Sequence, residues 1–234
     1  MMSSNLKAVI SPYEFRTVLA NTFGQFRNKL QQDAHEFLMA ILDKVVHLEK
    51  MCSGSAACEL VCRSCQERSP HIESFSCLSI EVMNETRASQ WTYPPYLADC
   101  VDGAFADEII RDDWVCKKCG GREAVKSSRM AIAPRIMVLH LKRFQSTENG
   151  YQKNKMLVKL PQTFQIAGHY FSIKGRVNHV GDSMNAGHYT ADIEIGEGRW
   201  MHCNDSKVFR CGMPRECSGD VYLVFCERKD VEKS

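Results

Sequence analysis

Apolar side chains recur at two different spacings along this chain, and the change of spacing divides it into two parts. Between Ser11 and Glu49 the spacing is helical, and it predicts a short helix after Pro12 followed by a longer one. The apolar positions are Phe15, Val18 and Leu19 in the short helix, and Phe37, Leu38, Ile41, Leu42, Val45 and Val46 in the longer one. The small residues between Met51 and Cys58 predict a flexible end to this helical region.

From Glu59 onward, short segments rich in β-branched and aromatic residues replace the helical pattern, and turn residues separate them. The predicted strands cover residues 75–82, 130–140, 156–160, 164–166, 169–180, 188–195 and 221–226. One further helix is predicted from Leu97 to Asp107, because Leu97, Val101 and Phe105 fall on one face. The fold class is therefore α+β, with helices first and a mainly β part after them.

Composition and charge narrow the class of protein. The chain has 234 residues, of which 44% are hydrophobic, enough for a substantial core. Its formal net charge is +2 and it has no long basic run, so neither nucleic acid nor an anionic membrane is expected as a partner. No apolar stretch reaches the ~20 residues of a membrane-spanning helix or resembles a signal peptide, so we expect a cytoplasmic or nuclear protein, or both. The basic pair Lys142-Arg143 is expected to be a solvated strand end.

Four of the twelve cysteines form two Cys-x-x-Cys pairs, Cys62-Arg-Ser-Cys65 and Cys116-Lys-Lys-Cys119. Each pair places two thiolates in one tight turn, which is half of a tetrahedral metal site. Such pairs also arise by chance or in redox proteins, but neither has the flanks of a redox motif, and Gly120-Gly121 suits a zinc knuckle. The sequence therefore predicts one structural zinc ion held by all four cysteines.

The stretch from Gly187 to Ser206 contains a candidate acid–base pair, His188 and Asp205. A histidine that a carboxylate or amide orients can take the proton from an attacking thiol. Pairing of a strand at 188–195 with one at 199–203 would bring Asp205 back toward His188. A histidine followed by an aspartate is by itself more often ordinary structure, and no nucleophile for this pair stands out in the sequence.

Several motifs occur in an order that resembles the ubiquitin-specific protease family. They are Gln31 to Phe37, His140 to Phe144, Val177 to Gly181 leading to Gly187 to Ala191, Trp200 to Ser206, and Tyr222 to Phe225. Both Cys-x-x-Cys pairs also lie where that family has its zinc-binding fingers. Together these motifs cover the chain from about Pro12 to Cys226.

The resemblance implies a papain-like hand with a helical thumb at residues 11–50, zinc-bearing fingers at 59–130 and a mainly antiparallel β palm at 131–227. It implies ubiquitin or ubiquitinated proteins as partners, and thiol-dependent hydrolysis of the bond after the ubiquitin C-terminus as the reaction. By resemblance, His188 is the general base, Asp205 orients it, and the four paired cysteines hold zinc at the fingertips. Gln31, Gln32 and Asp33 would hold the ubiquitin tail, and His179 and Tyr189 would line the same channel.

The chain departs from the family at the nucleophile, which belongs to an N-terminal Gly-Asn-Thr-Cys-Phe box upstream of the Gln31 motif. Here Asn21-Thr22-Phe23 contains no cysteine, so we expect an N-terminally truncated version of the fold. Three explanations are open: a fragment of an active enzyme, a noncatalytic ubiquitin-binding or scaffold protein, or substitution by another thiol. The candidates for such a thiol are Cys52, Cys58 and Cys203. A zinc-ribbon module that binds nucleic acid through Lys117-Lys118 is a further alternative, which the low net charge disfavours.

Overall fold

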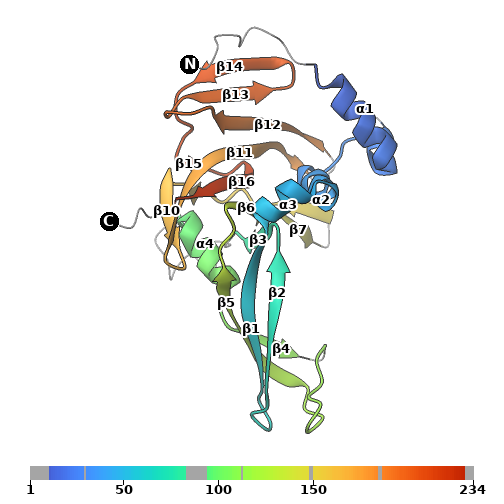
Figure 1. The fold of residues 1–234 in the computed structure, drawn as a ribbon, viewed down its shortest axis with the longest axis vertical. Helices are drawn as coiled ribbons and strands as arrows, with labels where there is room; N and C mark the ends of the chain where they lie inside the picture. Colours follow the sequence, from blue (N-terminus) through green and yellow to red (C-terminus); the bar gives the residue numbers. More distant parts are fainter. Residues whose placement is uncertain are drawn as a thin grey trace.

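Helices at one end of the chain lead into two large β-sheets, one of which extends away from the other as a long projection (Figure 1). The computed structural model describes residues 11–28, 30–82, 94–111, 113–147, 150–183 and 186–229. Within them the helical segments come first and strands dominate after Gly54, which confirms the predicted α+β class. None of the described helices is long and apolar enough to cross a lipid bilayer.

The thumb consists of α1 (Tyr13–Thr22), the 3₁₀ turn η1 (Gly24–Arg27), α2 (Ala34–Lys44) and α3 (Val46–Cys52). Both predicted helices are present, but the longer one is divided at Val45, whose backbone is non-helical (φ −104°, ψ 81°). Asp33 caps α2, because its Oδ1 accepts hydrogen bonds from the N–H groups of His35 and Glu36 at 2.7 and 2.9 Å. The start of α2 is therefore fixed by a side chain that also faces the palm.

The fingers are an antiparallel sheet of β1 (Gly54–Cys62), β2 (Arg68–Phe75), β4 (Glu108–Arg111) and β5 (Glu123–Ile132), in the order β2-β1-β5-β4. The prediction of a flexible segment up to Cys58 is wrong, because strand β1 starts at Gly54. A β-carbon at Gly54 would lie 2.6 Å from the Phe75 ring of the neighbouring strand. The small residues there allow close strand packing and do not form a turn.

The palm is an eight-stranded sheet with β10 paired to β11 and the other strands in the order β14-β13-β12-β11-β16-β6-β3. All neighbours are antiparallel except β3 and β6. The strands are β3 (Leu78–Glu81), β6 (Ile136–Lys142), β10 (Thr163–Ile166), β11 (His169–Ser183), β12 (Ala186–Glu194), β13 (Trp200–Asn204), β14 (Lys207–Cys211) and β16 (Val221–Arg228). Two small sheets pair β7 (Phe144–Thr147) with β8 (Gly150–Lys153), and β9 (Val158–Lys159) with β15 (Cys217–Ser218).

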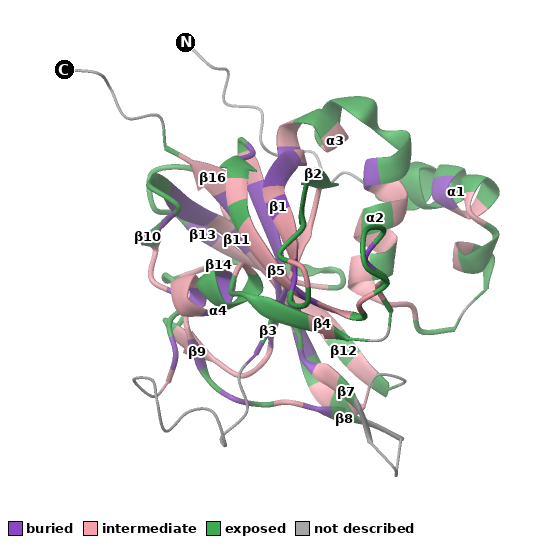
Figure 2. Ribbon diagram, turned by 90° about the horizontal axis from the view of Figure 1, so that it is seen from below, coloured by how far each residue is buried: buried purple, intermediate pink, exposed green. Residues whose placement is uncertain are grey.

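The main hydrophobic core lies between the palm sheet and α4 (Leu97–Ala104), which ends three residues before the predicted Asp107. Leu97 and Val101 of α4 and Phe171 of β11 are completely buried in it. A smaller cluster of Leu42, Cys52 and Val138 attaches the thumb to the palm. Figure 2 shows the resulting contrast, with buried positions in the palm strands and a largely exposed α1. The thumb thus depends on few apolar contacts.

Adjacent residues of β11 provide a test of this core. Phe171→Ala should lower the free energy of unfolding by about 3–5 kcal/mol, because the ring is fully buried and its loss leaves a cavity. Tyr170→Ala, the matched control at a side chain that is 47% exposed, should cost less than about 1 kcal/mol. Urea unfolding of both variants measures the difference, and equal losses would contradict the assignment of Phe171 to the core.

Candidate catalytic and zinc-binding sites

His188 lies near the start of β12, where its ring meets the end of β13. Its Nε2 is 2.7 Å from Oδ1 of Asn204. An amide oxygen only accepts hydrogen bonds, so Nε2 must be the protonated nitrogen of the ring. In the neutral imidazole the other nitrogen, Nδ1, then has a free lone pair. The pair His188–Asn204 therefore presents Nδ1 as a base in a fixed orientation.

The predicted partner, Asp205, is one residue away from this contact. It lies in the two-residue turn between β13 and β14, in a left-handed conformation (φ 50°). The register pairs Asp192 with His202 and Glu194 with Trp200, so even-numbered residues of β12 and β13 share one face of the sheet. His188 and Asn204 are both even, whereas Asp205 is not. The alternation of side chains along a strand therefore indicates from the sequence that Asn204, and not Asp205, lies on the same face as His188.

The segment before α2 contacts the start of β12 directly. Gln31 Oε1 accepts a hydrogen bond from the N–H of Gly187 at 3.1 Å, which places this side chain beside His188. Gln32 donates instead to Oδ1 of Asn28, within its own segment. Of the two glutamines, only Gln31 therefore has a hydrogen bond to the palm among the described residues.

Asp33 joins the thumb to the palm through its second carboxylate oxygen. Oδ2 accepts hydrogen bonds from the hydroxyl groups of Tyr222 at 2.6 Å and Tyr189 at 3.3 Å. Burial raises the pKa of both tyrosines, and the negative charge of Asp33 raises it further, so both hydroxyls stay protonated as donors. Tyr222 belongs to the motif from Tyr222 to Phe225, but the sequence did not predict its hydrogen bond to Asp33.

His179 lies on β11, the strand next to the one that carries His188, directly opposite Tyr189. The ring is only 2% exposed and packs edge-on against Phe144 and Tyr189, with centroid distances of 5.1 and 4.9 Å. A β-carbon at Gly187 would lie 2.1 Å from its Nε2. Burial lowers the pKa of His179, as does the nearby Lys153 ammonium, so the ring is held in its neutral form. His179 thus supports the backbone at Gly187.

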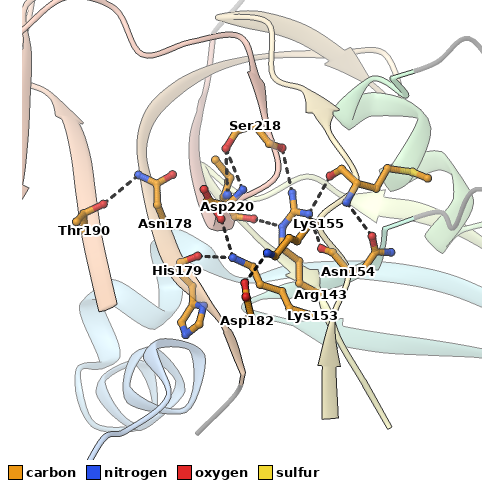
Figure 3. A network of polar contacts seen from close by, with 12 residues as sticks. Arg143, Lys153, Asn154, Lys155, Asn178, His179, Asp182, Thr190, Ser218 and Asp220 are labelled. Atoms are coloured by element: carbon orange, nitrogen blue, oxygen red, sulfur yellow. Dashed lines mark hydrogen bonds and ion pairs between the residues drawn. The ribbon is translucent and has the colours of Figure 1, made fainter. Parts of the chain in front are cut away.

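A buried polar network positions the backbone of His179 (Figure 3). The His179 N–H donates to the carbonyl of Asp220 at 2.8 Å, and Lys153 Nζ donates to the His179 carbonyl and to Oδ1 of Asp220. Beside it Arg143, which is completely buried, donates to the carbonyls of Val221, Asn154, Met156 and Ser218. The expectation that Arg143 is solvated is therefore wrong, because its guanidinium lies inside the fold and donates to four backbone carbonyls there.

The two Cys-x-x-Cys pairs meet at the far end of the fingers, with Cys62 as the last residue of β1, Cys65 in the turn that follows, and Cys116 and Cys119 before β5. The Sγ atoms are 3.7 Å apart for Cys62 and Cys119 and 3.6 Å for Cys65 and Cys116, and all four lie within 4.8 Å of one another. Zinc bonded to four sulfurs at ~2.3 Å requires sulfur separations of about 3.8 Å. The cluster therefore fits a structural zinc ion, as predicted.

Gly120 and Gly121 allow the second knuckle to close against the first. Gly120 has a left-handed backbone (φ 74°), and its N–H donates to the carbonyl of Cys116 at 2.9 Å. A β-carbon at Gly121 would lie 2.8 Å from the Ser64 hydroxyl of the other knuckle. Both glycines are therefore needed for the four sulfurs to meet.

Sequence comparison identifies relatives across almost the whole chain. The family model described as ubiquitin carboxyl-terminal hydrolase matches residues 1–225. Ubiquitin carboxyl-terminal hydrolase 44 of Ailuropoda melanoleuca is 25% identical over 294 residues, covering 99% of this chain and 41% of that protein. Probable ubiquitin carboxyl-terminal hydrolase 9 of Schizosaccharomyces pombe is 26% identical over 231 residues, covering 86% and 38%. The chain thus spans about two fifths of the length of these relatives.

Structural comparison gives the same fold. The Ubp8/Sgf11/Sus1/Sgf73 module of SAGA bound to monoubiquitin matches with a TM-score of 0.78 and 24% identity, covering 94% of this chain and 53% of that chain. The same module bound to ubiquitin aldehyde matches with a TM-score of 0.78 and 23% identity, covering 94% and 54%. These matches confirm the predicted hand-like architecture of thumb, palm and fingers.

If the four cysteines hold zinc, replacing one of them should release the ion. Cys116→Ser should reduce the zinc retained after dialysis from about one ion per chain to almost none, because three thiolates hold it less tightly than four. It should also lower the melting temperature by at least about 5 °C. Elemental analysis and calorimetry measure both effects. Cys217→Ser, the matched control outside the cluster, should keep the zinc; retention by Cys116→Ser would refute the four-cysteine site.

A stacked pair of histidines beside Asp33 predicts part of the pH dependence of stability. Burial lowers the pKa of His140 from 6.5 to about 4, and the neighbouring His35 ring, 4.0 Å away, adds to this effect. The folded state therefore favours neutral His140, and this stability is present above pH 6.5 and lost as the pH falls toward 4.

His140→Gln should consequently lose less stability than the parent protein between about pH 7 and about pH 5. Urea unfolding at the two pH values measures the two losses. His169→Gln, at an exposed histidine of β11, is the control and should follow the parent protein. Equal losses in all three proteins would show that His140 titrates normally in the fold.

Proposed function

Because the chain belongs to the ubiquitin carboxyl-terminal hydrolase family, we propose that it binds ubiquitin and presents the acid–base part of a thiol-dependent deubiquitinase site. The observation that carries this proposal is the 2.7 Å contact between His188 Nε2 and Asn204 Oδ1, beside the Asp33 cluster that joins thumb to palm. His188 is the general base, and Asn204, in place of the predicted Asp205, is the residue that orients it. The solved modules with ubiquitin bound support ubiquitin as the partner.

The chemistry follows from the tautomer of His188, in which Nε2 carries the proton and Nδ1 has a free lone pair. Its Nδ1 takes the proton of a thiol, and the thiolate attacks the carbonyl at the ubiquitin C-terminus, forming a carbon–sulfur bond. The tetrahedral intermediate expels the amine of the modified protein, which leaves with the proton from Nδ1. Water then hydrolyses the thioester with His188 again as base, which releases ubiquitin and restores the thiol. Throughout this cycle Asn204 keeps the ring in one tautomer.

The ubiquitin tail is proposed to run between the start of α2 and the start of β12. Gln31 lies at this junction with its amide group exposed, where its NH₂ is available to an extended backbone. Asp33 and Tyr189 form the wall through their mutual hydrogen bond. Because His179 is buried, its proposed role is to keep Gly187 close beneath the tail and not to contact the tail itself.

Whether the protein hydrolyses the bond after ubiquitin or only binds ubiquitin depends on which thiol can act with His188. A second candidate function is ubiquitin binding without hydrolysis, which the positions of the three candidate thiols favour. Cys203 of β13 is paired with Ala191 of β12, so its side chain lies on the face of the sheet opposite to His188, and Cys58 lies within the finger strand β1. Cys52 is buried against Leu42 in the thumb. These environments explain why none of the three is proposed as the nucleophile.

A ubiquitin derivative with a C-terminal electrophile tests the proposal on the full chain. If a thiol acts with His188, intact-mass analysis should find one covalent adduct, and peptide mapping should locate it at a single cysteine. His188→Ala and Asn204→Ala should slow adduct formation at least about tenfold, because the base is lost or loses its orientation. Asp205→Ala is the matched control one residue further on, and its rate should stay within about twofold of the parent.

Calorimetric titration with unmodified ubiquitin tests the binding part separately. Ubiquitin binding without an adduct would leave the second candidate, a noncatalytic ubiquitin-binding domain. A folded, zinc-loaded sample with neither binding nor adduct would overturn the proposal altogether. Equal slowing by Asp205→Ala and Asn204→Ala would reject Asn204 as the specific partner of His188.

A further inference from the structure

The fingers contain a second cluster of metal-ligating side chains, separate from the four-cysteine site. It consists of Cys58 of β1 with His71 and Glu73 of β2, and its ligand atoms all lie within 4.8 Å of one another. Cys58 is buried, whereas His71 and Glu73 are exposed to solvent. Because Cys58 and Cys62 are four residues apart on one strand, the two sites are separated by about 13 Å.

The strand register brings these three residues together. Cys58 is directly opposite His71, and Glu73 is opposite Ala56, two residues along the same face. Opposite side chains on an antiparallel pair are ~5 Å apart at Cβ, and diagonal ones are within reach of long side chains. A thiol, an imidazole and a carboxylate therefore converge on one face of a rigid hairpin.

The neighbouring contacts resemble the surroundings of a metal site. His71 Nε2 is 3.0 Å from Glu73 Oε1, so a proton between them occupies a position that a metal ion can take. Ser128, opposite Cys58 on β5, donates its hydroxyl to Cys58 Sγ at 3.4 Å and fixes the sulfur. The cluster thus has both ligands and a group that orients one of them.

Lys126 forms an ion pair with Glu73, the carboxylate of the cluster. Its Nζ donates to both oxygens of Glu73, at 2.8 and 3.0 Å. This ion pair is partly exposed and contributes little, so a divalent ion can compete with it. The carboxylate has two oxygens, and one can keep the Lys126 contact while the other binds the ion.

We propose that Cys58, His71 and Glu73 form a second zinc site, with three protein ligands and an open fourth position. A thiolate, an imidazole and a carboxylate suit Zn²⁺ among the divalent cations, and three ligands give an exchangeable ion. The bound ion would cross-link β1 to β2 partway between the knuckles and the palm. Binding would release the proton of the Cys58 thiol, while a neutral His71 keeps its one ring proton on the other nitrogen, so the affinity should increase with pH.

Cobalt titration of the full chain, dialysed first so that it retains only the zinc of the four-cysteine site, tests the proposal, since Co²⁺ adopts the same ligands and its thiolate complexes absorb light. We expect one additional equivalent to bind, with a thiolate-to-cobalt absorption band. Cys58→Ser should abolish this band, and Glu73→Gln should weaken binding at least about tenfold. Lys126→Met should bind cobalt at least as tightly as the parent, because the competing ammonium is gone. Cys217→Ser, a thiol outside the fingers, should leave the titration unchanged.

Three outcomes would overturn the proposal. The first is the absence of an additional equivalent with a thiolate band. The second is a band that persists in Glu73→Gln and His71→Asn at the parent affinity; both positions are exposed, so these variants should fold even if Cys58→Ser does not. The third is release of one zinc ion per cobalt bound, which would mean that cobalt had exchanged into the four-cysteine site.

Discussion

The geometry of the His188 site depends on one carboxylate, that of Asp33. One of its oxygens caps α2 through two backbone N–H groups, and the other accepts the hydroxyls of Tyr189 and Tyr222. A carboxylate with four donors is fully satisfied in a partly buried position, and hydrogen bonds to a charged acceptor are stronger than neutral ones. Since the apolar contact between thumb and palm is small, this polar junction sets where Gln31 meets Gly187, and hence the surroundings of His188.

The sequence predicted those parts of the site whose residues are neighbours in the chain. The zinc ligands are the clearest case, because each Cys-x-x-Cys pair forms its half of the cluster locally and the pairing of β1 with β5 needs only to align the halves. The cluster of Cys58, His71 and Glu73 had no such spacing, since its members meet only through the register of β1 and β2. Register depends on packing across strands, which a single sequence specifies weakly.

At two other places the structure differs from the prediction made from the sequence, and in both the cause is a tertiary contact. The segment at Gly54 has the composition of a flexible loop, yet Phe75 of the adjacent strand requires small residues there. Arg143 was expected in solvent because charged side chains rarely lie in a core, but four backbone carbonyls converge on its guanidinium, which has five N–H groups to donate. In both cases a tertiary contact outweighs the local preference. Asn204 differs, since strand alternation alone was sufficient to identify it.

The connections between fingers and palm have a mechanical consequence. Only Ser53 separates α3 from β1, Ser76 and Cys77 separate β2 from β3, and residues 133–135 separate β5 from β6. With three such short links in parallel, the finger sheet cannot swivel freely, and a torque applied at its tip passes into the thumb helix α3 and the palm strands β3 and β6. A load on the fingertips would therefore strain the contact between thumb and palm, so this projection acts as a lever on that contact.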